Sequence, residues 1–252
     1  TLSIQLWKNY ADLFSVTLQT PSGTRIPVLF GQGRRQRALT QETEVLIYAG
    51  EPSPYSVWQE VFFDLLPRRD FIEPGVWAIL LEPVKIVSGG YRLYLPGQEV
   101  RNAQTRFLRP AAELTLTVPS TAAKILTAGA GRRGNDAYAD FSGRGAAGWA
   151  GCETVPADTK PDLIAPGTDL VVPAPDGGVL RVTGTSFSAP LVTGTAALLM
   201  EWGIVQGNDP YLYGEKMKAY LRRGARPVSG ETVYPNERTG YGALCAAESL
   251  PG

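Results

Sequence analysis

The chain contains no histidine, and this absence restricts its chemistry more than any other feature of its 252 residues. Histidine is the side chain that most often acts as a general base near neutral pH, and it is a common metal ligand. Any mechanism that needs an imidazole as base, nucleophile or ligand is therefore excluded for this chain alone. Such a group must come from sequence outside it.

Cysteine is scarce and the net charge is zero. Cys152 and Cys245 are the two cysteines, which excludes a disulfide-rich scaffold and a four-thiolate zinc site but leaves one disulfide open. We expect both to be small buried side chains. The 24 Lys and Arg residues balance 24 Asp and Glu residues, so we expect no nucleic-acid partner.

Long apolar runs are absent as well. The longest, residues 196–200, is far shorter than the roughly 20 residues of a membrane span, and no basic segment followed by an apolar one opens the chain. We therefore expect a soluble protein without a membrane partner. The chain starts at Thr1 rather than Met, which is typical of a processed product or an excised fragment.

The first part of the chain, residues 1–112, has the pattern of antiparallel strands. Apolar and polar residues alternate over residues 2–6 and 14–18, and the turn at residues 21–23 separates the second run from the next one. Further strand-like runs follow at residues 26–28, 44–48, 57–65, 76–81 and 91–95. About seven short strands in this length predict a β-sandwich of the jelly-roll kind.

This part also holds most of the aromatic residues. Trp7, Trp58 and Tyr91 could either pack in the core or form a sugar-binding face. We expect core packing, because a period of two buries half of each strand. The basic run at residues 33–37 is expected to be a solvated loop rather than a processing or anion site.

The second part, residues 113–252, predicts an α/β sheet with tight loops. It contains most of the glycines, and residues 124–130 and 162–165 resemble short buried strands. A helix is expected from Ser186 to about Trp202, with Gly203 as its C-cap; it is apolar nearly all round, which is typical of a central helix packed on several sides. A second, amphipathic surface helix is expected near residues 211–223.

The segment that opens the apolar helix is the candidate site for chemistry. Ser186, preceded by Gly184 and Thr185, is placed at a helix N-terminus, where unpaired backbone N–H groups and the helix dipole stabilise an oxyanion. We expect Pro190 to lie in the first turn, where its missing N–H has no partner. The alternative is that Ser186 only caps a structural helix.

The longer pattern identifies a family. Residues 184–200, GTSFSAPLVTGTAALLM, resemble the nucleophile segment of the subtilisin-like serine proteases (subtilases, peptidase family S8). Other family-like segments occur in the family's order, at residues 119–130 (PSTAAKILTAGA), 141–145 (FSGRG), 160–167 (KPDLIAPG) and 240–242 (GYG). The resemblance covers about residues 113–250, the C-terminal part of a subtilase domain.

The resemblance also shows what is missing. Subtilases have an Asp, a His and an oxyanion-hole Asn before the Ser in sequence order, and the matching part begins after the Asn. Residues 1–112 then occupy the place between the oxyanion-hole segment and the PSTAAK segment, as the jelly-roll insertion does in the clostridial Csp-type germination proteases. Asp162 matches a structural position, so no Asp here is assigned to the triad.

The resemblance implies a serine endopeptidase of protein or peptide substrates. Ser186 is then the nucleophile and its backbone N–H one oxyanion donor, while the Asp, His and Asn come from outside the chain. This chain alone is expected to be inactive. It is also expected to associate with the N-terminal part of the same protein, to self-associate through an open sheet edge or to repack, because the central helix otherwise exposes apolar surface.

Two rival functions remain open at the level of sequence. A non-catalytic subtilase homologue that binds a partner has the same residues up to Ser186. A carbohydrate-binding or adhesion module would act through the sandwich. The turn at Arg132–Arg133 is expected to be a surface feature, and no metal or cofactor is expected because no EF-hand pattern or carboxylate cluster occurs. The compartment is undecided, with secretion and association with bacterial spores both open.

Overall fold

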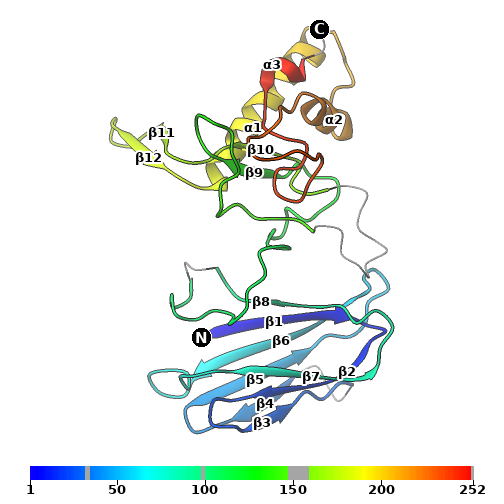
Figure 1. Cartoon of the computed structure of the whole chain (residues 1–252), viewed down its shortest axis with the longest axis vertical. Helices are drawn as coiled ribbons and strands as arrows, with labels where there is room; N and C mark the ends of the chain where they lie inside the picture. Colours follow the sequence, from blue (N-terminus) through cyan, green and yellow to red (C-terminus); the bar gives the residue numbers. More distant parts are fainter. Residues whose placement is uncertain (32–34, 98–99, 147–158, 251–252) are drawn as a thin grey trace. The chain divides into compact units, whose positions relative to one another are not determined.

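The computed structural model describes residues 1–31, 35–97, 100–146 and 159–250 (Figure 1). The described residues divide into two compact units at the Pro110–Ala111 junction. The first unit consists of strands and the second of short strands and helices. Cys152 lies outside the described residues, and Cys245 is a half-buried free thiol.

The first unit contains two antiparallel sheets. One has the order β4-β5-β6-β1-β8 and the other the order β3-β2-β7. The strand pairing agrees with the alternating sequence pattern. Strands β1 and β6 are antiparallel partners over eight residue pairs, from Leu2↔Leu65 to Asn9↔Trp58. The strand bounds are β1 Leu2–Asn9, β2 Leu13–Gln19, β3 Arg25–Pro27, β4 Gln36–Leu39, β5 Thr43–Ala49, β6 Trp58–Pro67, β7 Ala78–Lys85 and β8 Tyr91–Tyr94.

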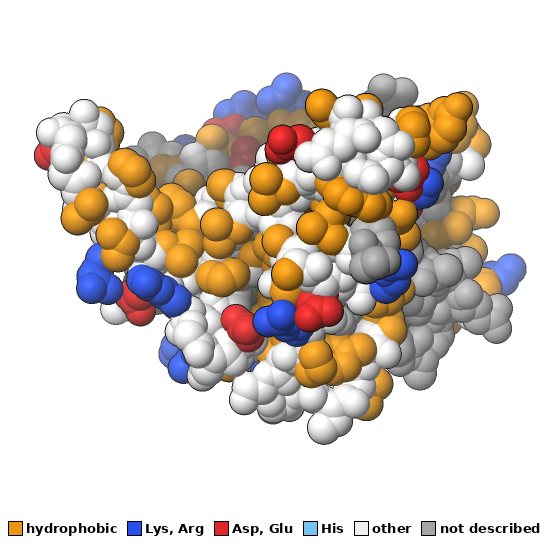
Figure 2. All heavy atoms as spheres, turned by 90° about the horizontal axis from the view of Figure 1, so that it is seen from above, with side chains coloured by type: hydrophobic (Ala, Val, Ile, Leu, Met, Phe, Trp, Pro, Cys, Tyr) orange, Lys and Arg blue, Asp and Glu red, His pale blue; other side chains and the backbone are white. Residues whose placement is uncertain are grey.

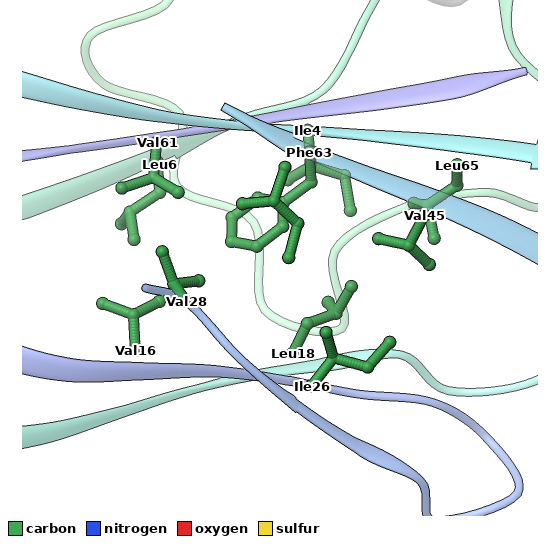
Figure 3. Close-up of a cluster of buried hydrophobic side chains, with 11 residues drawn as sticks. Ile4, Leu6, Val16, Leu18, Ile26, Val28, Val45, Val61, Phe63 and Leu65 are labelled. Carbon is green, nitrogen blue, oxygen red and sulfur yellow. The ribbon is translucent and has the colours of Figure 1, made fainter. Parts of the chain in front are cut away.

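The two sheets share one apolar core, as Figure 3 shows. Leu6 and Phe63 enter it from the larger sheet, while Val16 and Leu18 enter it from the smaller one, and all four are fully buried or nearly so. Each of these residues is apolar within an alternating run, so the period of two places it on the inner face. The unit is therefore a two-sheet β-sandwich; its jelly-roll connectivity stays a prediction.

The tryptophans do not all pack where the sequence predicts. Trp77 packs against the core cluster, whereas Trp7 and Trp58 do not belong to it and are half-buried, and Tyr91 is 48% exposed. The prediction of core packing is thus wrong for Trp7, Trp58 and Tyr91. Trp7 and Trp58 alternate out of phase with the inward residues of β1 and β6, and the Arg92 guanidinium lies 4.4 Å from the ring centre of Trp58.

The basic run at residues 33–37 is not wholly a loop. Residues 33 and 34 lie outside the described part, but Arg37 lies in β4, which pairs with β5 in the register Arg37↔Leu46. The Nε atom of Arg37 lies 2.6 Å from a carboxylate oxygen of Glu44. The sequence prediction fails here because a four-residue edge strand with two exposed positions carries too little alternation to detect.

A buried polar contact fixes the β7–β8 connection. The Asp12 carboxylate accepts backbone hydrogen bonds from Val87 (2.6 Å), Ser88 (2.8 Å) and Gly89 (2.8 Å). The Lys8 ammonium, which is also buried, donates to the Asp12 carbonyl at 2.7 Å. Burial opposes ionisation of the carboxyl, but the three N–H donors outweigh it and hold the pKa of Asp12 below its ordinary value.

The second unit is built around a parallel strand pair and one long helix. Strands β9 (Ala128–Gly131) and β10 (Leu163–Pro166) pair in parallel, with Ala165 opposite Ala130. The remaining elements are the hairpin β11 (Leu170–Pro173) and β12 (Val179–Val182), α1 (Thr185–Met200), the π-helical turn η2 (Glu201–Val205), α2 (Glu215–Arg223) and α3 (Ala246–Ser249). The sequence patterns did not predict the β11–β12 hairpin.

Helix α1 packs on the strand pair through a single stripe. Its buried residues are Ser188, Val192, Thr195 and Leu199, spaced by four, three and four positions as expected for one helix face. On its other side Leu198 is 60% exposed. Within the described residues the helix is therefore not packed on several sides, and the sequence prediction of a centrally packed helix is not met by this chain alone.

Gly203 does not cap α1. The helical path continues through η2 to Val205, and a Cβ on Gly203 would lie 2.7 Å from Leu212 Cδ2. The glycine is required for close packing rather than for a turn. The second predicted helix starts later than expected, at Glu215, and Lys218 points inward instead of lying on the polar face, being only 3% exposed.

Candidate active site

Ser186 is the second residue of α1 and is exposed to solvent. The residue before the helix, Gly184, has φ 153°, a backbone conformation that favours glycine. No side chain caps the helix, and its first turn carries no acidic residue. The Phe187 N–H donates to the Gly184 carbonyl at 3.1 Å, and the positive end of the helix lies beside the Ser186 hydroxyl, where it favours an oxyanion.

Pro190 lies deeper in the helix than predicted. Because α1 begins at Thr185, Pro190 is its sixth residue, and an amide there would have bonded the carbonyl of Ser186 in the regular i to i−4 pattern. The proline therefore removes a hydrogen bond from the second turn rather than an unpaired donor from the first. The expectation that it has no hydrogen-bonding cost is wrong.

The residues before Ser186 are attached to the ends of the strand pair. The Gly184 N–H donates to the Gly167 carbonyl at 2.8 Å, and the Gly167 N–H donates to the Gly131 carbonyl at 2.9 Å. The Asp169 N–H donates to Thr183 Oγ1 at 3.0 Å. The segment that carries Ser186 is thus fixed to the carboxyl ends of β9 and β10, the edge at which open α/β sheets hold their sites.

The turn after β9 reaches the same neighbourhood. The Arg133 N–H donates to Thr168 Oγ1 at 3.0 Å, while Arg132 forms an exposed ion pair of 3.0 Å with Asp140. Both arginine side chains are exposed, in agreement with a surface turn.

A buried ionic cluster supports the unit from behind β10. Asp162 Oδ2 accepts from the Thr127 N–H at 2.6 Å and lies 2.8 Å from Lys160 Nζ, and Oδ1 lies 2.5 Å from Arg222 Nη2. Lys218 Nζ is 3.4 Å from Oδ1. Burial lowers the pKa of Lys160, and the Asp162 carboxylate opposes that shift. One fully buried carboxylate therefore binds three cationic side chains.

The cations of this cluster also hold the coil before β9. Lys160 Nζ donates to the Ile125 carbonyl, and Lys218 Nζ donates to the Ala123 carbonyl at 2.7 Å. Asp162 was expected to have a structural role, and its contacts are those of a structural residue. Apart from Lys160, which lies two residues before it, the partners of its carboxylate lie 35 to 60 residues away in sequence, so the fold brings them together.

The exposed side of α1 is rich in apolar side chains. Leu191, Leu198 and Met200 are 41%, 60% and 42% exposed, and hydrophobic side chains are numerous on the face drawn in Figure 2. The 21 residues Thr185–Val205 form a helix long and apolar enough to cross a membrane, and 28% of its 18-residue apolar window is buried. A core helix of a soluble protein meets the same criteria of length and apolarity.

Metal ligands do not gather in the part of the chain that the structure describes. No group of three or more Cys, Asp or Glu side chains lies close enough together there to hold an ion.

Sequence reasoning missed two residues that adjoin this site. Ser188 and Gly167 both lie within quoted motif segments, GTSFSAP and KPDLIAPG. The strand and helix patterns give no sign that the two meet, because their contact depends on how α1 crosses the strand ends.

Comparisons with known proteins test the family resemblance of the sequence. The sequence profile of the subtilase family matches residues 102–242, more than half of the chain. The solved structure of the Clostridium perfringens CspB protease superposes with a TM-score of 0.84 at 32% sequence identity, covering 98% of this chain and 50% of that one.

Two sequence relatives agree with this result. The serine protease AprX of Bacillus subtilis is 28% identical in an alignment 158 positions long that covers 55% of this chain and 32% of AprX. Subtilisin-like protease 10 of Arthroderma otae is 34% identical in an alignment 113 positions long that covers 37% of this chain and 26% of that protein. The chain thus spans half of the CspB protease and about a third or less of these two relatives, and it belongs to the subtilase family of serine peptidases.

Proposed function

We propose that this chain is the C-terminal portion of a subtilisin-like serine endopeptidase and carries its nucleophile, Ser186. The observation that supports this most is the exposure of Ser186 at the uncapped N-terminus of α1, in the position that the family motif GTS predicts. The substrate class is protein or peptide, as expected for a subtilase. No cofactor is required for this chemistry.

The proposed reaction follows the logic of a serine nucleophile with a separate base. Ser186 Oγ attacks the carbonyl carbon of the scissile peptide, and its proton passes to a histidine supplied by sequence outside this chain. An aspartate from the same source orients that histidine. The backbone N–H of Ser186 and an asparagine side chain from outside the chain stabilise the oxyanion. The histidine then protonates the leaving amine, and water hydrolyses the acyl-enzyme.

The isolated chain is expected to be inactive. It contains no histidine, so nothing in it can take the proton from Ser186 at neutral pH with the efficiency of an imidazole. Removing the base alone lowers turnover on the order of 10⁶-fold in the related enzyme subtilisin. Activity therefore requires both parts of the catalytic domain.

The exposed side of α1 is proposed to be covered by the N-terminal part of the same protein. Parallel sheets are normally larger than two strands and have both faces covered, whereas β9 and β10 form a two-stranded sheet with α1 as its helix. The solved CspB protease is about twice as long as the matched region. We further propose that residues 1–112 are a jelly-roll-like insertion in that domain, followed by the peptidase segment 113–252.

A fluorophosphonate probe tests the function directly. The complete protein and the 252-residue chain are incubated with the probe, and the labelled residue is located by mass spectrometry. We expect labelling at Ser186 in the complete protein, none in the isolated chain, and none in a complete Ser186→Ala variant. Absence of labelling in the folded complete protein would instead identify a non-catalytic homologue.

Sedimentation of the isolated chain tests the proposed covering of α1. We expect association with the added N-terminal segment, or self-association in its absence. A compact monomer that does not respond to the N-terminal segment would contradict the proposal.

A further inference from the structure

We propose that the hydroxyl of Ser188 is a positioning group for the nucleophile, because it ties the start of α1 to the end of β10. This inference rests on the proposed role of Ser186. Ser188 does not touch the reacting atoms, and its effect is exerted through the backbone on which Ser186 is carried.

The segment around Ser186 has two attachments, one on each side. Two residues before it, the Gly184 N–H donates to the Gly167 carbonyl at 2.8 Å. Two residues after it, Ser188 Oγ donates to the Pro166 carbonyl at 3.2 Å. The two acceptors are consecutive residues at the end of β10. Ser186 is thus held at the midpoint of a five-residue segment whose ends are bonded to the carbonyls of two consecutive residues.

The acceptor side of this attachment is itself fixed. Pro166 lies opposite Gly131 in the β9–β10 register, and the Gly167 N–H donates to the Gly131 carbonyl. A Cβ at Gly167 would meet Ser188 Oγ and would lie 2.7 Å from Ala130 Cβ. The strand ends and the first turn of α1 are therefore in close contact, with no space for a side chain between them.

Ser188 differs from the other hydroxyl-bearing residues farther along the helix. Thr193 Oγ1 and Thr195 Oγ1 donate to carbonyls four residues earlier in α1, Ala189 and Leu191, at 3.0 Å each. This is the usual local pattern for Ser and Thr in a helix. The Ser188 hydroxyl instead donates to a carbonyl of strand β10, outside its own helix. Its side chain is fully buried, so water cannot readily replace it.

Loss of this bond is expected to change the chemical step more than substrate binding. Without it, one of the two hydrogen bonds that flank Ser186 remains, the one from the Gly184 N–H to the Gly167 carbonyl. A displacement of about 1 Å at a reacting group can cost about 100-fold in rate. We therefore expect Ser188→Ala to lower kcat about 10- to 100-fold while KM changes less than about twofold, with the pH profile unchanged because the base is untouched.

The test uses the complete enzyme and three variants. Ser188→Ala removes the hydroxyl, Ser188→Cys keeps a weak donor, and Thr195→Val is the matched control, since it deletes a buried α1 hydroxyl that bonds only its own helix. The readouts are kcat, KM, the rate of fluorophosphonate labelling at Ser186 and the melting temperature. We expect slow labelling for Ser188→Ala, an intermediate rate for Ser188→Cys and a rate near wild type for Thr195→Val.

Different failures give different results. If Ser188→Ala folds and is labelled at the wild-type rate, the positioning role is refuted. If Thr195→Val is slowed as much as Ser188→Ala, the effect is one of general stability and the proposal is again refuted. Should Ser188→Ala fail to fold, the Ser188→Cys variant decides, and wild-type labelling of that variant counts against the role. If the wild-type enzyme itself is not labelled, the proposed function fails first.

Discussion

Replacing Asp162 with asparagine tests whether one buried carboxylate holds the second unit together. The substitution keeps the size of the side chain but removes its charge. Three cations then remain around it, with 9%, 4% and 13% of the Lys160, Lys218 and Arg222 side chains exposed. In addition, the NH2 group of the asparagine would replace one carboxylate oxygen of Asp162. It would face the N–H donors that this oxygen now accepts from, and donors do not bond donors.

The expected loss of stability is large. Removing one partner from a buried ion pair typically costs about 3–5 kcal/mol, because the remaining charge is left buried without compensation. Here the pKa of Lys160 is already lowered by burial, and Asp162 opposes that shift. In the Asp162→Asn variant the ammonium loses this support, so we expect its pKa to fall further, at about 1.4 kcal/mol per pKa unit.

Hydrogen exchange at increasing urea concentrations measures the loss of stability in the second structural unit. Amides of β10 report the opening of the second unit separately from the sandwich. Asp140→Asn is the control, since it also removes one negative charge from an ion pair, but that pair is exposed and is expected to contribute only about 0–1 kcal/mol. A loss below about 1 kcal/mol for Asp162→Asn, or equal losses for the two variants, would refute the reasoning.

Three further predictions concern the cores and the acid response. Phe63→Ala should destabilise the sandwich by about 3–5 kcal/mol, whereas Phe71→Ala, at a position 57% exposed, should change its urea midpoint little; equal shifts would contradict this. Because the pKa of Asp12 is lowered in the fold, its carboxylate stabilises the sandwich above about pH 4 and stops doing so as pH falls through the lowered value. Melting temperatures across this range should therefore fall more steeply for wild type than for Asp12→Asn, and parallel curves would disprove it. In the isolated chain in its monomeric form, Leu199→Ala should cost about 2–5 kcal/mol by urea denaturation of the second unit and Leu198→Ala, at a position 60% exposed, much less; equal losses would contradict this.

The sequence could predict features that depend on neighbours along the chain. The alternation of residues 2–6 places Ile4 and Leu6 on one face of a strand, and both are buried in the sandwich. The same alternation places Trp7 on the opposite face, so a strict use of the period would have excluded it from the core. The expectation was wrong because it used the period of two to count half of each strand as buried without assigning Trp7 to one of the two faces.

Features that depend on distant contacts could not be predicted. The polarity of Lys218 indicates a solvent-facing position on α2. The side chain is instead buried beside the carboxylate of Asp162, which lies 56 residues earlier in the sequence. The family motif located Ser186 correctly at a helix start, since the pattern itself contains the turn. It did not reveal that Ser188 bonds a strand, because Pro166 is 22 residues away and separated from it by an unpredicted hairpin.

The β11–β12 hairpin closes on itself at its base. Gly184 donates to Gly167, and Asp169 donates to Thr183. The two ends of the hairpin therefore lie side by side. Its tip at Asp176 and Gly177 is exposed. Lengthening a flexible loop costs only about 0.6 kcal/mol per doubling, so this tip is a suitable position for grafting an epitope tag or a fluorophore-binding peptide.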